Sequence, residues 1–425
     1  MPFQKILQIF KIRDIRNKIL FVFGILVIFR IMANIPIPGI DTSRLRDLFS
    51  GFQFLGLLNL FTGGALENLS IAMLGLGPYI TGSIIMQLLT MIFPGLKAIY
   101  QEEGDIGRQK FNQYSRILTV PLAILQSFGL LTLLQRQQIL GPLSPLIFSI
   151  SILTITAGCL FLMWLGELIS EKGIGNGISL LIFAGIVSGL PGDIRQLAVS
   201  WDTARILSYL FFLAMALIMV ALVVMINEAR RNIPVSYAKR VRGMRLYGGT
   251  STYLPLNVNP AGVIPIIFAI SIILLPGMMA SFLTGVGGII GNVAQNVAAF
   301  LNNTWVYGVS FFVLVVLFTY FYTAVTFDPK AISSNLQKMG GYIPGTRPGE
   351  STAKFLQYIL NRVLPIGALF LGAIAVLPSI IGAATGVLVF QFLIGGTSLL
   401  IVVSVVLETV RQVKSQLQMR EYETF

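Results

Sequence analysis

Side chains that commonly carry chemistry are nearly absent from this chain of 425 residues. It has no histidine and one cysteine, Cys159, which excludes histidine-based triads, histidine metal sites, cysteine zinc clusters and disulfides within the chain. The acidic cluster Glu102, Glu103 and Asp105 is interpreted as a solvated patch, and no serine elbow or metal-spaced set of carboxylates occurs. Cys159 lies in an apolar stretch and is predicted to be a small buried hydrophobe. We therefore expect no enzyme and no cofactor.

Ionisable residues at membrane depth are the usual mark of proton relays and ion-coupled carriers. The interiors of the apolar stretches carry essentially none, because Arg30, Arg362 and Glu408 all lie near the ends of a stretch. Long side chains at such positions can reach the membrane interface. A proton- or sodium-coupled carrier is therefore disfavoured.

The elements that position the remaining residues are apolar helices. Hydrophobic residues make up 55% of the chain and charged residues 11%, and the mean hydropathy is +0.82. Soluble chains have about 45–50% apolar residues and about 25% charged residues. Long unbroken apolar runs favour helices over a membrane β-barrel. At roughly 20 residues per span, we expect ten spans, near residues 19–33, 71–93, 117–134, 146–168, 178–190, 206–226, 263–283, 306–327, 355–377 and 387–407.

Basic residues set the orientation of these spans. Segments on the side of the N-terminus hold 24 of the 30 lysines and arginines. Because cytoplasmic loops are enriched in lysine and arginine, both termini are predicted to be cytoplasmic. Two loops on this side, 227–258 and 328–354, are longer than bundle connections usually are and rich in basic residues, glycine or proline. They are interpreted as docking surfaces for an anionic or acidic partner, with solvated loops as the alternative.

The segment 52–94 breaks the pattern of regular spans. Its first apolar piece, 52–61, is too short to cross a membrane, and a polar, glycine-containing joint, 62–70, follows it. Irregular backbone at membrane depth is tolerated only where protein or a cavity surrounds it. We therefore expect a half-helix that folds back into the bundle, the alternative being an amphipathic loop on the exterior face.

These residues resemble the SecY/Sec61-alpha family of protein-conducting channels along the whole chain, with a pattern similar to bacterial members. The matching blocks, in chain order, are FTGGALENLSIAMLGLGPYITGSIIMQLL (61–89), Gly166–Ser179 with GIGNGIS, YAKRVRGMRLYGGTSTYLPLNVNPAGVIP (237–265), PGTRPGE (344–350) and FLIGGTSLLIVV (392–403). The resemblance implies an all-α membrane protein of ten transmembrane helices in two pseudo-symmetric five-helix halves, 1–190 and 191–425. The halves are hinged near 190–205 and enclose an hourglass pore with a re-entrant plug helix within about 52–69.

The resemblance also implies roles for particular residues. The pore ring would be Leu76, Ile80, Ile178, Ile182, Ile267 and Ile401, and the plug would include Phe61, Thr62, Gly63, Gly64, Ala65 and Leu66. Gln87 and Asn259 would be the polar residues of a lateral gate, where a neutral hydrogen bond contributes about 0.6–2 kcal/mol. Lys239, Arg240, Arg242, Arg245 and Arg347 would dock the motor ATPase SecA and the ribosome with its RNA.

The implied function is translocation of unfolded preproteins across the bacterial cytoplasmic membrane and lateral insertion of membrane proteins. The pore would be passive and powered by SecA or the ribosome. Implied partners are SecE, SecG, signal sequences, nascent preproteins and anionic lipids. Two other classes stay open from the residues themselves: an intramembrane enzyme, which lacks a catalytic constellation here, and a secondary carrier with discontinuous helices, which lacks intramembrane charges.

Overall fold

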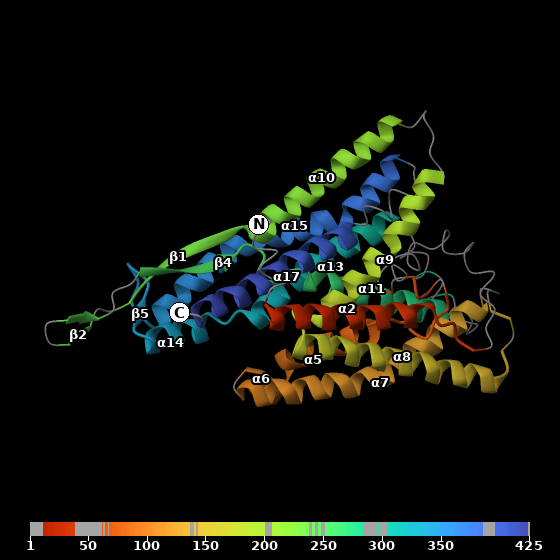
Figure 1. The fold of residues 1–425 in the computed structure, drawn as a ribbon, viewed down its shortest axis with the longest axis horizontal. Coiled ribbons are helices and arrows are strands. Elements are labelled where there is room, and N and C mark those ends of the chain that lie inside the picture. Colours follow the sequence, from red (N-terminus) through yellow and green to blue (C-terminus); the bar gives the residue numbers. More distant parts are fainter. Residues whose placement is uncertain are drawn as a thin grey trace.

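The computed structural model describes residues 12–38, 62, 64–66, 68–101, 103–136, 140–141, 143–199, 206–237, 240–242, 245–247, 251–283, 292, 296, 304–385 and 396–423. Helices dominate these residues, and the long ones lie side by side in a bundle (Figure 1). They are α2 (Arg13–Asn34), α5 (Gly77–Ile92), α6 (Pro94–Gln101), α7 (Gly104–Arg136), α8 (Pro145–Lys172), α9 (Gly177–Val199), α10 (Ile206–Glu228), α11 (Ile264–Leu283), α13 (Thr304–Thr326), α14 (Pro329–Lys338), α15 (Glu350–Thr385) and α17 (Gly396–Glu423).

Local chemistry explains where several helices begin. Ser144 caps α8, because its hydroxyl accepts from the Ile147 amide at 3.3 Å and Pro145 follows at the first helical position. Asp328 caps α14 in the same way, accepting from the amides of Lys330 and Ala331. At the break before Pro94 the chain turns by 116° between α5 and α6, since proline cannot continue the hydrogen bonding of the preceding helix.

The described helices correspond to predicted spans, but some begin or end at residues other than those predicted. The second span was predicted from residue 71, but residues 71–76 form turns and the helix begins at Gly77. The fifth was predicted to end near residue 190, where the hinge loop was expected; instead α9 continues through Pro191 to Val199. Residues 200–205 and 386–395 lie outside the described ranges, so the rest of that loop and the start of the tenth span do too.

Five described helices are long and apolar enough to cross a membrane, or six if the bent pair α5–α6 is counted as one span. The five are Ile106–Gln135, Pro145–Lys172, Tyr209–Glu228, Trp305–Lys338 and Glu350–Leu377. Shorter apolar helices lie in α9 and α11. The chain is therefore a multi-pass membrane protein, and the number of ten spans stays a prediction.

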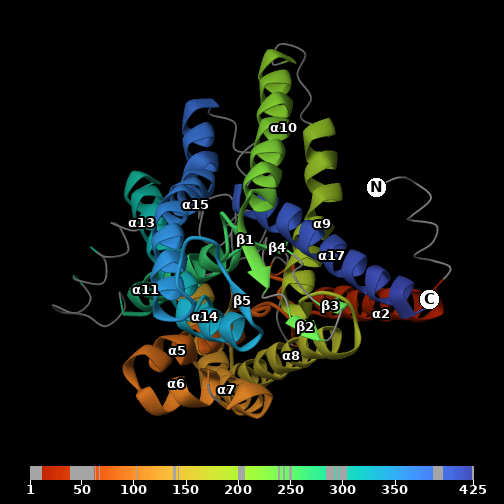
Figure 2. The ribbon, with the colours of Figure 1, turned by 90° about the vertical axis from the view of Figure 1, so that its left-hand side faces the viewer.

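Short strands gather at one end of the bundle, and Figure 2 views the molecule from that side. They are β1 (Arg230–Tyr237), β2 (Arg240–Arg242), β3 (Arg245–Tyr247), β4 (Ser251–Asn257) and β5 (Gly341–Tyr342). β1 pairs antiparallel with β4, from Arg230 opposite Asn257 to Ser236 opposite Ser251. We call the segment 230–257, which contains β1, β2, β3 and β4, the arm. The end of the bundle that carries it is the arm end.

Two apolar cores hold the bundle together. The larger joins α2, α5, α8, α9, α10, α11, α13, α15 and α17. A smaller one packs Leu66, Leu69 and Met73 against α7 and α8, where Leu130, Leu131 and Ile155 are fully buried. Outside the membrane, removing apolar surface from water stabilises the fold by about 25 cal/mol per Å². Within the bilayer, close packing between helices contributes most of the stability.

Candidate functional site

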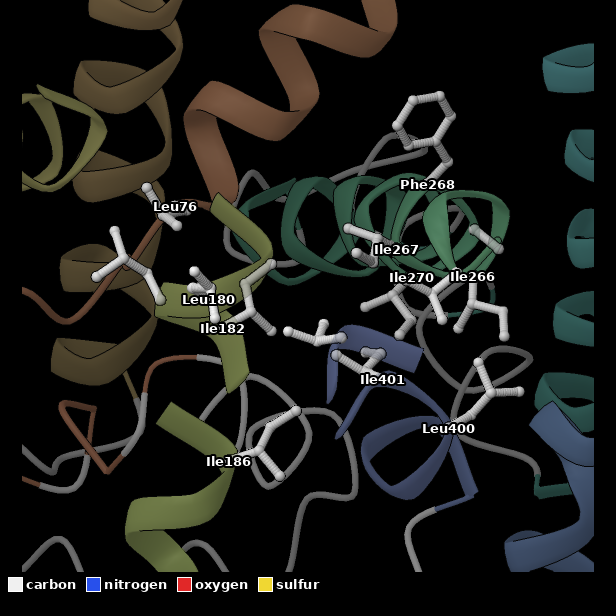
Figure 3. Packing of buried hydrophobic residues seen from close by; sticks show 14 of the residues in the cluster. Leu76, Leu180, Ile182, Ile186, Ile266, Ile267, Phe268, Ile270, Leu400 and Ile401 are labelled. Carbon is white, nitrogen blue, oxygen red and sulfur yellow. The ribbon is translucent and has the colours of Figure 1, made fainter. Parts of the chain in front are cut away.

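The residues predicted to form a pore ring lie in one apolar cluster. Leu76, Ile182, Ile267 and Ile401 are each at most 7% exposed and belong to the larger core. They come from the turn before α5, from α9, from α11 and from α17, and Figure 3 shows them in one region. The other two, Ile80 and Ile178, are partly buried and pack against the same cluster. Four segments far apart in the sequence thus present aliphatic side chains to each other.

The same cluster contains residues that the motif resemblance did not single out. Ile186 lies one turn beyond Ile182 on α9, and Ile270 lies one turn beyond Ile267 on α11 (Figure 3). Residues three or four apart share a helix face, so this spacing was the signal available in the sequence. Every one of these side chains is aliphatic. If these side chains surround a pore, as predicted, they would exclude water and ions by dewetting.

The segment predicted to be a plug is buried where the structure describes it. Thr62, Ala65 and Leu66 are at most 2% exposed, which disagrees with an amphipathic loop on the exterior face. Ala65 packs in the larger core and Leu66 in the smaller one, so neighbouring residues enter two cores. Residues 64–66 form a turn, while Gly63 and all of 52–61, Phe61 included, lie outside the described residues. The expected helical form of the plug is therefore untested.

Backbone hydrogen bonds fasten this segment to the end of α2. The Ile37 amide donates to the Leu69 carbonyl at 2.9 Å, and the Ile71 amide donates to the Ile35 carbonyl at 3.0 Å. Leu69 has φ of +41°, an unfavourable conformation for a residue with a side chain. The strain is held in place because the Leu69 side chain is fully buried.

The two predicted gate residues do not share a hydrogen bond through their amide oxygens. Oε1 of Gln87 and Oδ1 of Asn259 are both buried and have no donor. Asn259 instead donates through Nδ2 to Oδ1 of Asn227 at 3.1 Å and to the Gly262 carbonyl at 3.0 Å. Asn227 donates in turn to the Ser404 hydroxyl at 2.7 Å. The predicted gate residue Asn259 is therefore tied to α10 directly and to α17 through Asn227.

This polar network was missed at the sequence level. Arg411 on α17 extends it, donating to the Asn227 carbonyl at 2.7 Å and to Glu228 Oε1 at 3.0 Å. Asn227 and Glu228 immediately precede the arm, and Asn259 follows it. The network thus joins both chain ends of the arm to α17. Polar residues at the ends of the sixth and tenth apolar stretches were the signal that could have identified it.

The two predicted docking loops form one subdomain. Ser236 and Tyr237 of β1 pair with Tyr342 and Gly341 of β5, which gives the strand order β4–β1–β5. Below the sheet, a third apolar core joins β1, β4, α14 and α15, with the buried residues Ile233, Val235, Leu256, Leu336, Ile343 and Leu356. The alternating burial of β1 fits a sheet with one covered face. Both loops are therefore ordered over their described residues.

Basic residues predicted to dock partners lie on this subdomain. Arg240 and Arg242 are on β2 and Arg245 is on β3, with Arg242 paired to Arg245 beside the hairpin turn. Arg347 is exposed, and its carbonyl accepts from the Thr352 hydroxyl at 2.9 Å, which fixes the turn that carries it. Lys239 lies outside the described residues. Arg347 thus lies on the exposed surface of this subdomain.

The described ranges contain no candidate metal site. They contain no group of three or more histidine, cysteine, aspartate or glutamate residues able to hold a metal ion. Cys159 is 1% exposed and packed within α8, which confirms its interpretation as a buried small residue.

Comparison with known proteins identifies the family. A family model described as SecY matches residues 70–410. The chain belongs to the SecY family. It is 44% identical over 437 residues to the protein translocase subunit SecY of Streptomyces galbus and 44% identical over 441 residues to that of Corynebacterium glutamicum, with 98% of each chain covered in both cases.

Solved structures confirm the fold expected for the SecY family. One, described as the structure of a protein conducting channel, superposes with a TM-score of 0.66 at 21% identity, covering 93% of this chain and 91% of the other. Sec61 in the canine ribosome-channel complex from the endoplasmic reticulum gives a TM-score of 0.63 at 21% identity, with the same coverage. The shared fold thus covers most of this chain.

Proposed function

We propose that this chain is the central, pore-forming subunit of a protein translocase. It lets unfolded preproteins cross the bacterial cytoplasmic membrane and lets membrane proteins leave sideways into lipid. The observation that carries the proposal is the aliphatic cluster to which Leu76, Ile182, Ile267 and Ile401 contribute from four separate segments. An aliphatic constriction blocks ions when empty, yet deforms around a peptide of any sequence. The chain is a passive channel subunit rather than an enzyme.

Sealing at rest involves the waist and the plug together. The six predicted ring residues form the waist, and the segment around Thr62–Leu66 closes it from the external side. Burial of Thr62, Ala65 and Leu66 supports this role, because a plug must pack against the bundle when the channel is closed. The gate lies between the half 1–190 and the half 191–425, with Gln87 on α5 and Asn259 before α11 on its two sides. The unsatisfied amide oxygens of both residues support a seam that separates at low energetic cost.

The arm end is the docking surface for partners that supply force or substrate. It lies in the cytoplasm, as do both termini, because basic residues are concentrated in the segments on that side. Arg240, Arg242, Arg245, Arg347 and Lys239 there contact SecA or the ribosome and its RNA. A solved structure of Sec61 in a ribosome-channel complex, with the same fold, supports the ribosome as a partner. SecE and SecG complete the translocon, signal sequences and nascent preproteins enter it, and anionic lipids surround it.

Cross-linking of an arrested substrate tests the proposal. The only native cysteine is buried, so introduced cysteines report with little background. A preprotein stalled during translocation, with one cysteine in its middle, is expected to form disulfides with Ile182→Cys and Ile267→Cys. Phe268→Cys is the matched control, because Phe268 neighbours Ile267 on α11 but packs against Phe318 and Tyr322. Equal cross-linking at Phe268→Cys, or none at the two ring positions while transport continues, would place the path elsewhere.

A further inference from the structure

The glycine-rich loop 173–177, between α8 and α9, is a sequence motif to which the proposed function assigns no role. Its residue Ile174 is 4% exposed and forms a separate apolar cluster with Ile15 of α2. Val413 and Leu417 of α17 pack against this cluster. Figures 1 and 2 show the last turns of α17 beside the start of α2. The loop therefore lies at a contact between the proposed N-terminal half, which holds α2 and α8, and the proposed C-terminal half, which holds α17.

Hydrogen bonds and close packing fix the start of α9 to this loop and to α8. Oδ1 of Asn176 accepts from the Ile178 amide at 3.1 Å, which caps the first turn of α9. The Gly177 amide donates to the Ser170 hydroxyl at 2.9 Å. A Cβ atom added at Gly177 would overlap the Gly166 carbonyl oxygen, so the backbone of α9 lies directly against that of α8. The loop and the first turn of α9 are therefore seated on α8 together.

The same loop sets the position of α9 along α17. The two helices pack together and run in opposite directions, because the loop before α9 meets the later turns of α17 (Figure 1). A Cβ atom added at Gly175 would lie 3.6 Å from Oγ1 of Thr409. The predicted ring residue Ile401 precedes Thr409 by eight positions, and Ile182 follows Gly175 by seven. At a rise of 1.5 Å per residue, both lie about 10–12 Å from this contact. Ile182 and Ile401 are thus placed at the same depth, and Figure 3 shows them in one region.

We propose that the loop 173–177 is a joint that fixes α9 and α17 in register, with Ile174 as its positioning residue. This inference rests on the proposed function, because it concerns side chains that are proposed to form the waist. The joint keeps Ile182 and Ile401 opposed while the gate separates on the other contacts between the halves, those of α11 with α5 and α7. Slippage of α17 by one turn would move Ile401 by about 5.4 Å. The ring would then have a gap that water can enter.

Disulfide formation between two ring positions measures this register. Ile182→Cys and Ile401→Cys are introduced together into the full-length chain with its co-purifying subunits and oxidised in membranes without substrate. The buried Cys159 adds little background. Ile174→Ala is expected to slow this disulfide at least about threefold, because a one-turn slip of about 5.4 Å takes the two Cα atoms beyond the roughly 7 Å that a disulfide can bridge. Without the two cysteines, Ile174→Ala is expected to raise the resting conductance in a planar bilayer.

Ile233→Ala is the matched control for a loss of packing elsewhere. Ile233 is an isoleucine buried in the apolar core of the arm end, so its truncation leaves a comparable cavity without touching the joint. This control is expected to lower the free energy of unfolding, as Ile174→Ala does. It is expected to keep the disulfide rate of the parent and a silent resting channel.

A second variant changes the other side of the joint. Val413→Ala/Leu417→Ala truncates two partly buried side chains of α17 and is expected to reproduce both effects of Ile174→Ala, so it carries the test if Ile174→Ala does not assemble. The proposal is overturned if the parent pair forms no disulfide, or if the joint variants keep the parental disulfide rate and conductance. It is also overturned if Ile233→Ala loses as much. Failure of the proposed function is a separate result, in which a stalled preprotein does not cross-link to Ile182→Cys of the otherwise unchanged chain.

Discussion

Gly75 and Thr62 meet where the plug segment rests against the start of α5. Gly75 has φ of +54°, a left-handed conformation that costs an L-residue about 1–2 kcal/mol. A Cβ atom added there would lie 3.1 Å from Cγ2 of Thr62, closer than side chains normally approach. Both the turn and the contact therefore require glycine. The next residue, Leu76, belongs to the proposed waist, so the contact with the proposed plug and one residue of the ring lie on the same turn.

Gly75→Ala is expected to lower the free energy of unfolding by about 1–2 kcal/mol, because the backbone strain and the contact with Thr62 act together. The measurement is denaturant unfolding of the full-length chain in detergent micelles. Gly24→Ala is the control: Gly24 lies within α2 with nothing within 4 Å of the added Cβ, so the substitution is expected to be neutral or stabilising by up to about 1 kcal/mol. Equal effects of the two substitutions would contradict a tight seat at Gly75.

The two proposed gate residues each have a buried amide oxygen without a hydrogen-bond donor. An unsatisfied buried acceptor costs about 1–3 kcal/mol, and both Gln87 and Asn259 carry one. These costs lower the barrier to separating α5 from the segment before α11. Asn259 is nevertheless held by Asn227, which Ser404 and Arg411 also contact. Opening of the seam is thus expected to leave Asn259 attached to α10 and α17.

At the scale of elements, the arm end is a folded unit. The sheet β4–β1–β5 covers a core that includes Ile233 and Leu336, and β5 comes from the second loop. A partner that pushes on the turn carrying Arg347 therefore also pushes on the sheet, and through the network at Asn227 on α17. Under the proposed function, docking at the arm end can in this way affect the helices that form the proposed waist.

Arg347→Glu is expected to reduce SecA-driven export into vesicles at least about tenfold, because like charges placed together at an interface can cost several kcal/mol. Arg347 is exposed, so the yield and the unfolding free energy of the variant should match those of the parent. Lys338→Glu changes an exposed charge in the same subdomain and serves as the control. Unchanged export by Arg347→Glu, or equal loss in both variants, would remove Arg347 from the docking surface.

The sequence predicted helices better than it predicted their ends or the strands between them. Hydropathy located apolar stretches, but it could not show that residues 71–76 form turns, because Ile71–Leu76 is as apolar as the helix that follows. The fifth span was predicted to end near residue 190, yet α9 continues through Pro191 to Val199. In β1 the alternating Ile233 and Val235 are buried, but the adjacent arginines and Pro234 made the segment resemble a loop.

At the scale of the whole molecule, the waist is a product of long-range packing. Ile182, Ile267 and Ile401 have no feature of their own that distinguishes them from other isoleucines in apolar helices. Their selection came from motif resemblance, and their shared cluster became visible only in three dimensions. The hydrogen bonds of Asn227 could not be predicted at all, because they join residues 32 and 177 positions apart. The sequence thus showed which residues are aliphatic or polar, but not which of them contact each other.

The central claim is that the aliphatic side chains of the proposed waist are required to keep the resting channel closed to ions. Changing Ile182 and Ile267 together to Asn would place amides in the constriction, hydrate it and abolish dewetting. Changing the same pair to Val keeps the surface aliphatic and serves as the matched control. Both variants are first shown to translocate a preprotein, so that each is known to be folded and assembled.

The decisive measurement is single-channel conductance of the resting protein in a planar bilayer, without substrate or motor. The parent and the Val pair are expected to stay silent, and the Asn pair is expected to show ion-conducting openings. If the Asn pair translocates substrate and is as silent as the parent, the ion barrier lies elsewhere in the molecule and the assignment of the waist is wrong.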